Sequence, residues 1–433
     1  MNNIKMMILS WVLIGNLSGS GLLCAAETGQ VEVVKGLLKI KELNLEISNK
    51  NRRTALMLAA HNGHVDIVNL LIPRGADLDN QDKDESTALM LALSNVGTAL
   101  HHNCLCIVKI LIGEGADLDK QNKDGDTALM LASKGAVQAT SDQAYNDYLR
   151  AINALIGEEN HNRRADLDKQ NKDGTALMIF VKGGDGYGAG ILLGRGASCN
   201  VRVSDPFGDT ALIMALRKSD TTTASLLIRS KADIHCRYVN DETALMIASE
   251  KGCLDNVREL VDHRANCNER GNHKRTALMY ALCQRQLVRG IVDILAPKTS
   301  PNLRDSLDYT DLMYAAEKGH NIIRVLINAG ADVNFPNNFD ETALMRVACF
   351  GHKVVAVSLI QNGARVNLGN KVGRTALMYA SLHGHRDMVE TLVQRGAEVN
   401  LSSAITGDSA IELAHAKGHE EIVEFLLENG AIL

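Results

Sequence analysis

The fold of this chain is decided by one short stretch, Thr375-Ala376-Leu377-Met378, and by how often it returns. The same four amino acids begin again at Thr54, Thr87, Thr127, Thr175, Thr243, Thr276 and Thr342. Variants begin at Thr210, Thr310 and Ser409, and a faded copy begins at Ser20. Most successive copies lie 32 to 35 residues apart, with two longer steps of 40 and 48 residues. A period of this length indicates a stack of similar structural units.

Each unit carries the signals of two short helices. Thr375 predicts the N-cap of the first helix, and Gly384 predicts its end, because a left-handed residue commonly follows a helix. Apolar residues follow at helical spacing in both helices: Leu377, Met378 and Ala380 in the first, Val389, Leu392 and Val393 in the second. Gly396 predicts the end of the second helix. Two such helices cannot bury both faces alone, so neighbouring units must stack.

These features resemble the ankyrin-repeat family over residues 21–433. The resemblance rests on the tetrads, on terminal runs such as Gly330-Ala331-Asp332-Val333-Asn334, and on Gly-His pairs after the first helix. The pairs are Gly63-His64, Gly319-His320, Gly351-His352, Gly384-His385 and Gly418-His419. It implies one all-α domain over 21–433, an ankyrin-repeat solenoid of about 12 helix-turn-helix units joined by short β-hairpin-like turns.

One departure from the family concerns the tetrad itself. The family's usual Thr-Pro-Leu-His is replaced here by Thr-Ala-Leu-Met, as in Thr375 to Met378. In the family the histidine bonds within the turn, so we expect this polar contact to be missing and replaced by packing. Alanine in place of proline also explains why the chain has only five prolines.

Three insertions interrupt the regular spacing, near residues 95–103, 136–146 and 158–164. We interpret them as tolerated lengthening of loops, which costs little free energy; participation in binding is the alternative. A glycine-rich run at residues 183–190 predicts a flexible turn between helices. Its loose Gly-x-Gly-x-x-Ala pattern does not follow a strand, so it lacks the context of a dinucleotide site.

Composition excludes several classes of protein. Charged residues make up 22% of the 433 residues and are interspersed, which argues against disorder. A formal net charge of −5 gives no electrostatic reason to expect nucleic-acid binding. No apolar run reaches the length of about 20 residues that a membrane-spanning helix needs.

Residues 1–20 predict a secretory signal peptide, because Lys5 precedes an apolar run and small residues follow it. Cleavage after Ser20 or after Ala26 fits the small-residue rule; a buried first helix or a start-site artefact is the alternative. Leu23 disfavours a lipid anchor on Cys24. The nine cysteines show no framework spacing, which favours a reducing compartment. Export to the periplasm or outside the cell is our prediction, and a cytoplasmic location is the alternative.

No motif for catalysis, a cofactor or a metal emerges. Histidines 64, 320, 352, 385 and 419 share one position of the repeat, which indicates a structural role rather than metal binding. The chain has no HExxH, no GxSxG and no kinase signature. We therefore expect no catalytic residues, no cofactor and no metal.

Binding is the function that the sequence favours. Its few aromatic residues include several at predicted turn tips or ends of first helices, with charged neighbours, as at interface hot spots. The candidate partner-binding residues are Tyr309, Phe339, Phe350, Leu382, Asp340, Glu341 and Arg374. Tyr280, Tyr314 and Tyr379 share a position four residues after the tetrad threonine and are expected in the core.

We therefore predict a non-catalytic, monomeric scaffold that binds one or more partner proteins along its concave face and turn tips. The alternatives are a resident cytoplasmic scaffold and an enzyme without a recognisable motif.

Overall fold

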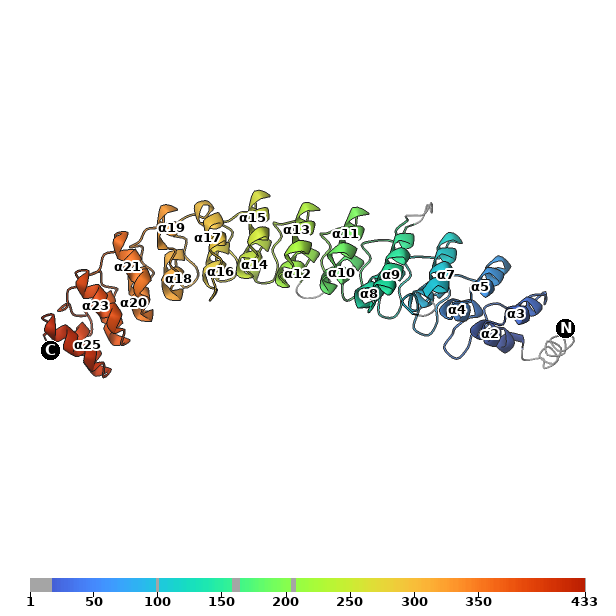
Figure 1. The fold of residues 1–433 in the computed structure, drawn as a ribbon, viewed down its shortest axis with the longest axis horizontal. Helices are drawn as coiled ribbons and strands as arrows, with labels where there is room; N and C mark the ends of the chain where they lie inside the picture. Colours follow the sequence, from blue (N-terminus) through green and yellow to red (C-terminus); the bar gives the residue numbers. More distant parts are fainter. Residues whose placement is uncertain (1–17, 99–100, 158–163, 204–207, 433) are drawn as a thin grey trace. The chain divides into compact units, whose positions relative to one another are not determined.

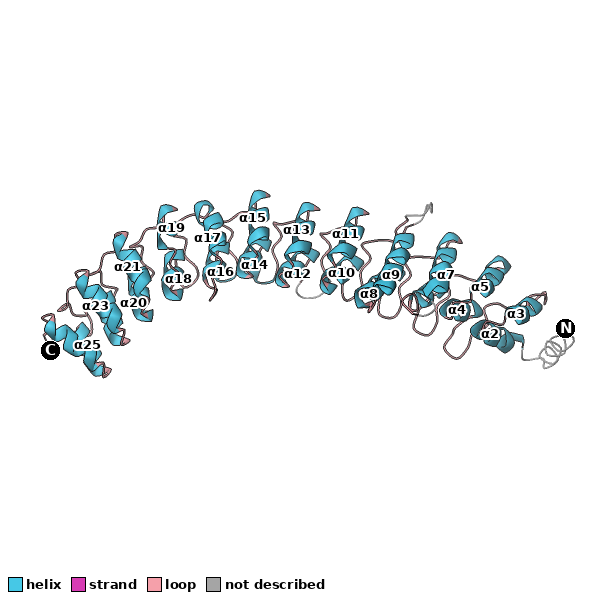
Figure 2. Ribbon diagram, viewed as in Figure 1, coloured by secondary structure: helices cyan, strands magenta, loops and turns pink. Residues whose placement is uncertain are grey.

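A computed structural model describes residues 18–98, 101–157, 164–203 and 208–432 of the chain (Figure 1). Within these ranges the regular structure is helical, which confirms the predicted all-α fold (Figure 2). In the described ranges β pairing is limited to isolated bridges: Ser48 with Thr54, Asn171 with Gly174, and Ser402 with Ser409. The chain divides into two compact units: unit 1 holds residues 1–215 and 229–232, and unit 2 holds residues 216–228 and 233–433.

Helices follow one another in pairs along both units. Those of unit 1 are α2 (Ser18–Thr28), α3 (Val31–Leu37), α4 (Ala55–His61), α5 (Val65–Leu71), η1 (Ile72–Arg74), α6 (Ala88–Leu93), α7 (His101–Gly113), α8 (Ala128–Gln138), α9 (Asp142–Leu155), α10 (Ala176–Gly183) and α11 (Gly186–Gly194). The unit boundary falls within α12 (Ala211–Arg217).

Unit 2 continues the same pattern. Its helices are α13 (Thr221–Arg229), η2 (Val239–Asp241), α14 (Ala244–Glu250), α15 (Leu254–Asp262), η3 (Asn272–Lys274), α16 (Ala277–Leu282), α17 (Arg289–Leu295), η4 (Ala296–Lys298), α18 (Asp311–Lys318), α19 (Ile323–Asn328), α20 (Ala343–Phe350), α21 (Lys353–Gln361), α22 (Ala376–Leu382), α23 (Arg386–Gln394), α24 (Ala410–Ala416) and α25 (Glu420–Glu428).

The helices of each unit form two layers. In unit 2 the first helices of successive repeats pack on one another, as α18 packs on α20 and α20 on α22; the second helices do the same, as α21 packs on α23. In unit 1, α2 packs on α4 and α3 on α5. The tetrads fill the core, since Leu377, Met378 and Ala380 are buried. In the second helix Met388 takes the buried place predicted for Val393, which is half-buried.

The tetrad threonines cap the helices that follow them. Thr375 Oγ1 accepts a hydrogen bond from the backbone N–H of Met378 at 3.4 Å, and Thr276 bonds Met279 in the same way at 3.2 Å. Thr342 has the same extended backbone but makes no capping bond with its side chain. A side-chain cap satisfies one of the N–H groups that the first turn leaves free.

The methionine of the tetrad is not purely a packing residue, contrary to our expectation. The backbone N–H of Thr375 donates to Met378 Sδ at 3.4 Å, and that of Thr243 donates to Met246 Sδ at 3.5 Å. Sulfur is a weak acceptor, yet it lies where a capping-box side chain reaches back to the N-cap. In these two repeats the polar contact is therefore weakened rather than lost.

The Gly-His pairs join neighbouring repeats. His352 Nε2 lies 2.9 Å from the backbone oxygen of Glu317, and His385 Nε2 lies 2.9 Å from that of Cys349. The ring of His352 lies against Gly319, where a Cβ would come within 2.9 Å of it. Gly319 also has a φ of +73°, so both the turn and the histidine require glycine. The histidines thus hold one repeat to the next.

The irregular segments are more helical than predicted. The extra residues near 136–146 lengthen α8 to Gln138 and start α9 at Asp142, instead of forming a long loop. The glycine run at residues 183–190 lies mostly inside α11, because only Gly184 and Asp185 stand between the end of α10 and the start of α11. A Cβ at Gly188 would lie 2.3 Å from the ring of Phe180, so helix packing accounts for this glycine. The insertion near 158–164 falls mostly outside the described residues.

The predicted leader overlaps the first helix. Residues 1–17 lie outside the described residues, and α2 begins at Ser18, ahead of the predicted start at Ser20. Leu22, Leu23, Ala25 and Ala26 are buried. Cleavage after Ser20 would leave this buried face in place, whereas cleavage after Ala26 would remove it.

Candidate functional site

A cluster of charged and aromatic side chains crosses the first helices of unit 2. We call it the Arg346 cluster: Arg346, Glu317, Tyr309, Glu341 and Phe350. Arg346 lies on α20 and forms an ion pair of 2.9 Å with Glu317 on α18, and a longer one of 3.8 Å with Glu341. Its guanidinium lies 5.1 Å from the ring centre of Tyr309 and 5.4 Å from that of Phe350. One cation thus holds three successive segments together.

Burial and neighbouring charges act together on the ionisable groups of this cluster. Burial alone would lower the pKa of Arg346, but the hydrogen bond to Glu317 and the nearby negative charges raise it. Burial raises the pKa of Tyr309 to about 12. The guanidinium is therefore charged and the phenol is neutral at physiological pH.

Glu341 extends the cluster to the next repeat. Its Oε1 accepts a hydrogen bond of 2.7 Å from the Tyr379 hydroxyl, and its Oε2 accepts one of 3.1 Å from Asn337 Nδ2. Burial, followed by the bond to Glu341, raises the pKa of Tyr379. Tyr379 is half-buried, whereas Tyr280 and Tyr314 lie in the core as predicted. The third tyrosine therefore belongs to the surface network.

A similar arrangement occurs on the other side of the cluster. Tyr314 donates a hydrogen bond of 2.5 Å to Asp305 Oδ2, and Arg275 Nε lies 3.6 Å from the same oxygen. The Arg275 guanidinium lies 5.4 Å from the ring centre of Tyr314. Tyrosine, arginine and carboxylate thus alternate over the first helices from α16 to α22.

Several turn tips before the first helices share one hydrogen bond in both units. In these tips an Asp or Asn side-chain oxygen accepts a bond from the N–H two residues later, as Asp305 does from Leu307 and Asn337 from Phe339. We call the residue that donates this N–H the tip residue. In unit 2 it is apolar at Leu307, Phe339 and Val372; in unit 1 it is a neutral Asn51 at the first such tip and acidic at Asp84, Asp124 and Asp173.

The apolar tips of unit 2 are open to solvent. Leu307 is 61% exposed and Phe339 is 64% exposed, while Val372 is half-buried. Ile405, in the turn before α24, is 71% exposed. Phe339 O accepts a bond of 3.0 Å from the N–H of Lys371, so neighbouring tips are joined through their backbones. Together these four residues form an apolar tip row.

The predicted partner-binding residues separate into two groups. Tyr309, Glu341 and Phe350 meet in the Arg346 cluster, and Phe350 is 43% exposed. Phe339 and Asp340 lie exposed at a tip, and Arg374 Nη2 lies 3.9 Å from Asp408 Oδ2. Leu382 is half-buried at the end of α22. The structure thus places the predicted residues on two surfaces, the first-helix layer and the tips.

Comparison with known families agrees with this architecture. A family model of ankyrin repeats in three copies matches residues 22–106, 138–238, 218–305, 288–369, 312–403 and 358–433. The chain belongs to the ankyrin-repeat family. Ankyrin repeats are scaffolds for protein–protein interaction, and this protein is accordingly an interaction scaffold.

Individual relatives of this ankyrin-repeat protein match only over short stretches. It is 37% identical over 70 residues to the NAD-capped RNA hydrolase NUDT12 of Homo sapiens, which is 16% of this chain and 15% of the hydrolase. It is 35% identical over 71 residues to alpha-latrocrustotoxin-Lt1a of Latrodectus tredecimguttatus, 16% of this chain and 5% of the toxin. Because the chain covers so little of either protein, these matches support the repeat and not an activity.

The ankyrin stack brings one cysteine and one histidine together. Cys349 Sγ lies 3.3 Å from His383 Nε2 at the end of the first helices. Burial raises the pKa of Cys349 and lowers that of His383, so both groups are held in their neutral forms. A nucleophilic cysteine needs its thiolate, which these surroundings disfavour. The pair is therefore a neutral contact between repeats.

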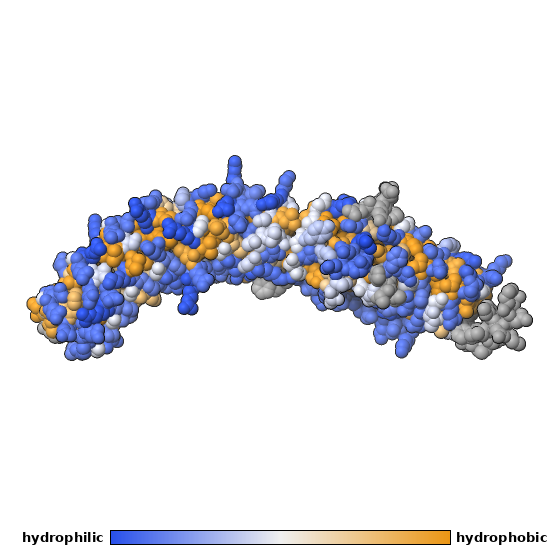
Figure 3. Space-filling model, viewed as in Figure 1, coloured by the Kyte–Doolittle hydropathy of each residue, from blue (hydrophilic) through white to orange (hydrophobic). Residues whose placement is uncertain are grey.

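In the described part of the chain, no three His, Cys, Asp or Glu side chains are grouped so that they could hold a metal ion. Over the same ranges, none of the helices has the length and apolar character required to span a bilayer. Hydrophilic residues cover much of the visible face, and apolar residues reach the surface in separate patches among them (Figure 3).

Sequence reasoning missed the centre of the cluster. Arg346 occupies the position four residues after the tetrad threonine, the place of Tyr280, Tyr314 and Tyr379 in neighbouring repeats. The sequence signal for Arg346 was a charged residue at a repeat position that is otherwise apolar or aromatic. Leu307 and Ile405 were also missed, and their signal was an apolar residue where earlier tips carry Asp or Asn.

Proposed function

We propose that the protein binds a partner protein through unit 2, with the apolar tip row and the Arg346 cluster as the contact surface. The observation that carries this proposal is the tip row, because three large apolar side chains, Leu307, Phe339 and Ile405, stand exposed on successive or nearby turns. Contiguous exposed apolar residues mark interaction sites in soluble proteins. Around them, aromatic and arginine side chains have the character of interface hot spots.

The Arg346 cluster gives this surface a rigid base. Its ion pair, stacked rings and hydrogen bonds fix the side chains before a partner arrives, so little conformational entropy is lost on binding. Phe350, at its exposed edge, is held by Arg346 and by the stacked ring of His352. A partner therefore meets a preorganised aromatic edge.

The test is partner capture from the native host with matched variants. We expect the double variant Leu307→Ser with Phe339→Ser to lose capture of the partner that the wild-type protein captures, without a change in melting temperature. Val354→Ser is the control, because Val354 is 64% exposed like Phe339 but lies on the second helix α21. Equal capture by the tip variant, or equal loss with Val354→Ser, would contradict the proposal.

We further propose that the protein is exported by its N-terminal leader and acts as a monomer. The signal-like residues 1–20 support export, and a cut after Ser20 would keep the buried face of α2. The nine cysteines are unpaired, which favours the cytoplasmic alternative. Sequencing the N-terminus of the mature protein decides between them, since a chain starting at Met1 contradicts export. Light scattering of the purified protein tests the monomer.

A further inference from the structure

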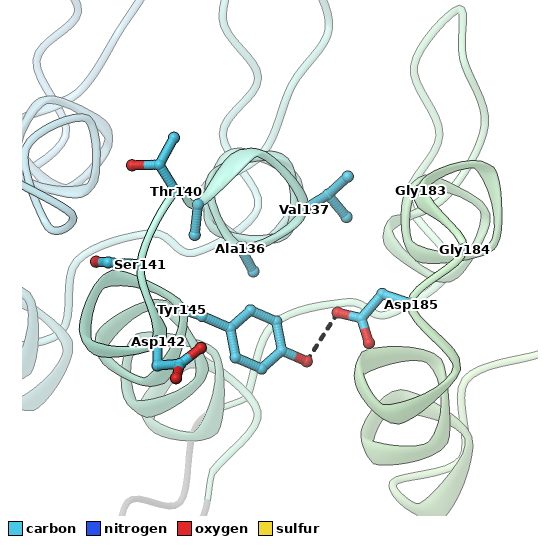
Figure 4. Close-up of a pocket in the computed structure, with 10 residues that line it drawn as sticks. Ala136, Val137, Thr140, Ser141, Asp142, Tyr145, Gly183, Gly184 and Asp185 are labelled. Carbon is cyan, nitrogen blue, oxygen red and sulfur yellow. Dashed lines mark hydrogen bonds between the residues drawn. The ribbon is translucent and has the colours of Figure 1, made fainter.

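Two irregular segments of unit 1 meet at one place. The lengthened end of α8 and the start of α9 come from the longest repeat step, and the turn between α10 and α11 comes from the glycine run. A cavity of about 420 Å³ lies between them. Its lining includes Val137, Ser141, Asp142, Tyr145, Gly184 and Asp185 (Figure 4).

Glycine makes this arrangement possible. A Cβ at Gly183 would lie 2.4 Å from Val137, so a larger residue would push the two segments apart. A Cβ at Gly184 would meet no atom within 4 Å, and its φ of +76° favours glycine. The close approach of α10 to α8 and the bare turn beside it together shape the cavity.

The cavity is acidic and contains one aromatic ring. Figure 4 shows the Tyr145 ring between the side chains of Asp142 and Asp185. The Tyr145 hydroxyl donates a hydrogen bond of 2.8 Å to Asp185 Oδ2, which fixes the ring. Burial, followed by this bond, raises the pKa of Tyr145, so the phenol stays neutral.

Within the described part of the chain, neither carboxylate is paired with a lysine or an arginine. Among the described residues that line the cavity, none is lysine or arginine. The nearby lysines are engaged elsewhere, because Lys134 Nζ lies 2.7 Å from Asp126 and Lys182 Nζ donates to the backbone oxygen of Asp173 at 2.7 Å. Each oxygen of Asp185 accepts one hydrogen bond, from Tyr145 or from Gly188 N, but no lysine or arginine among the described residues offsets the negative charge of either carboxylate. The two negative charges beside the aromatic ring therefore favour a cation from outside.

We propose that this cavity binds an arginine side chain of a partner protein. The planar guanidinium stacks on aromatic rings and donates several hydrogen bonds in fixed directions. On Tyr145 it would have one carboxylate at either side, a geometry that suits charge-assisted hydrogen bonds. This site lies in unit 1 and is independent of the docking surface proposed in unit 2.

An anion is the competing occupant, because the N-termini of α9 and α11 face the cavity. Their capping positions are already filled, however: Ser141 Oγ accepts from Ala144 N at 3.2 Å, and Asp185 Oδ1 accepts from Gly188 N at 2.8 Å. A helix end carries about half a charge, less than a carboxylate. The local field therefore favours a cation.

The experiment is an NMR titration of the full-length protein with N-acetyl-arginine amide. N-acetyl-citrulline amide is the matched probe, since it has nearly the same shape without the charge. We expect the arginine probe to shift the amide signals of Val137, Gly183 and Gly184, and the citrulline probe to bind at least about tenfold more weakly. Equal binding of both probes, or no shift with either, would overturn the proposal.

Variants locate the binding at the two carboxylates. Asp142→Asn and Asp185→Asn should each weaken arginine binding by about tenfold, and asparagine at 185 still caps α11. Asp66→Asn is the control, because Asp66 is an exposed residue in the first turn of α5, as Asp142 is in α9. An equal effect of the control, or inorganic phosphate shifting the same signals, counts against the arginine site.

Discussion

The Tyr379 hydroxyl donates a hydrogen bond of 2.7 Å to Glu341 Oε1. This bond ties α22 to the turn before α20, the first helix of the preceding repeat. Its acceptor is charged, so it contributes more than a neutral hydrogen bond. We expect Tyr379→Phe to lower the free energy of unfolding by about 1–2 kcal/mol, measured by chemical denaturation. Tyr187→Phe is the control, because Tyr187 is 68% exposed. Equal losses in the two variants would disprove a special role for the bond.

Capping predicts a difference between two threonines that look identical in the sequence. Thr375→Val should cost about 1 kcal/mol, because it removes the acceptor for the Met378 N–H and keeps the side-chain volume. Thr342→Val should cost clearly less, since Thr342 makes no capping bond. Denaturation midpoints of the two variants decide the matter. Similar midpoints would show that the threonines are retained for packing.

Asp311 is an aspartate where other repeats have alanine, and it is buried. Burial raises its pKa from 3.8 to about 7, and its Oδ1 has no hydrogen-bond partner within the described part of the chain. The folded state holds the proton more tightly than the unfolded state. Stability should therefore fall as the pH rises from about 4 to about 7 and stay constant above.

Replacing this carboxyl should stabilise the protein. We expect Asp311→Ala to raise the unfolding free energy by about 2–4 kcal/mol at neutral pH, with little effect near pH 4. Asp311→Asn should remove the pH dependence as well, because it removes the charge and keeps the shape. Denaturation curves over this pH range provide the measurement. An unchanged pH profile in Asp311→Asn would mean that another group titrates.

Two glycines of α11 should respond to alanine in opposite directions. A Cβ at Gly188 would lie 2.3 Å from Phe180, so Gly188→Ala should destabilise unit 1 by about 1–3 kcal/mol. A Cβ at Gly194 would meet no atom within 4 Å, so Gly194→Ala should stabilise by about 0.5–1 kcal/mol through helix propensity. Thermal unfolding of both variants is the measurement. A loss at Gly194 as large as that at Gly188 would rule out packing as the cause.

The periodic features could be predicted from sequence because each is repeated and local. The helix pairs, the threonine caps and the joining role of the histidines all depend on residues close in the chain or one repeat away. The Arg346 cluster could not be predicted as a unit. Tyr309, Glu341 and Phe350 were candidates, but Arg346 and Glu317 are brought to them only by stacking. The cavity beside Tyr145 escaped for the same reason, since its two halves looked like separate irregularities.

Backbone hydrogen bonds join neighbouring tips in both units, as from Lys123 N to Asp84 O at 3.1 Å and from Lys371 N to Phe339 O at 3.0 Å, but two acidic tips of unit 1 add ion pairs. Asp84 lies 3.9 Å from Lys123 Nζ, and Asp124 lies 3.8 Å from Lys172 Nζ, so these two tips are each paired with a lysine of the next repeat. These exposed pairs are screened by salt, whereas burial of Leu307 or Phe339 against a partner is not. At high ionic strength the side-chain pairs along the edge of unit 1 should weaken, while binding of a partner to the apolar tips of unit 2 should persist. One polypeptide thus carries a salt-sensitive border and a salt-tolerant one.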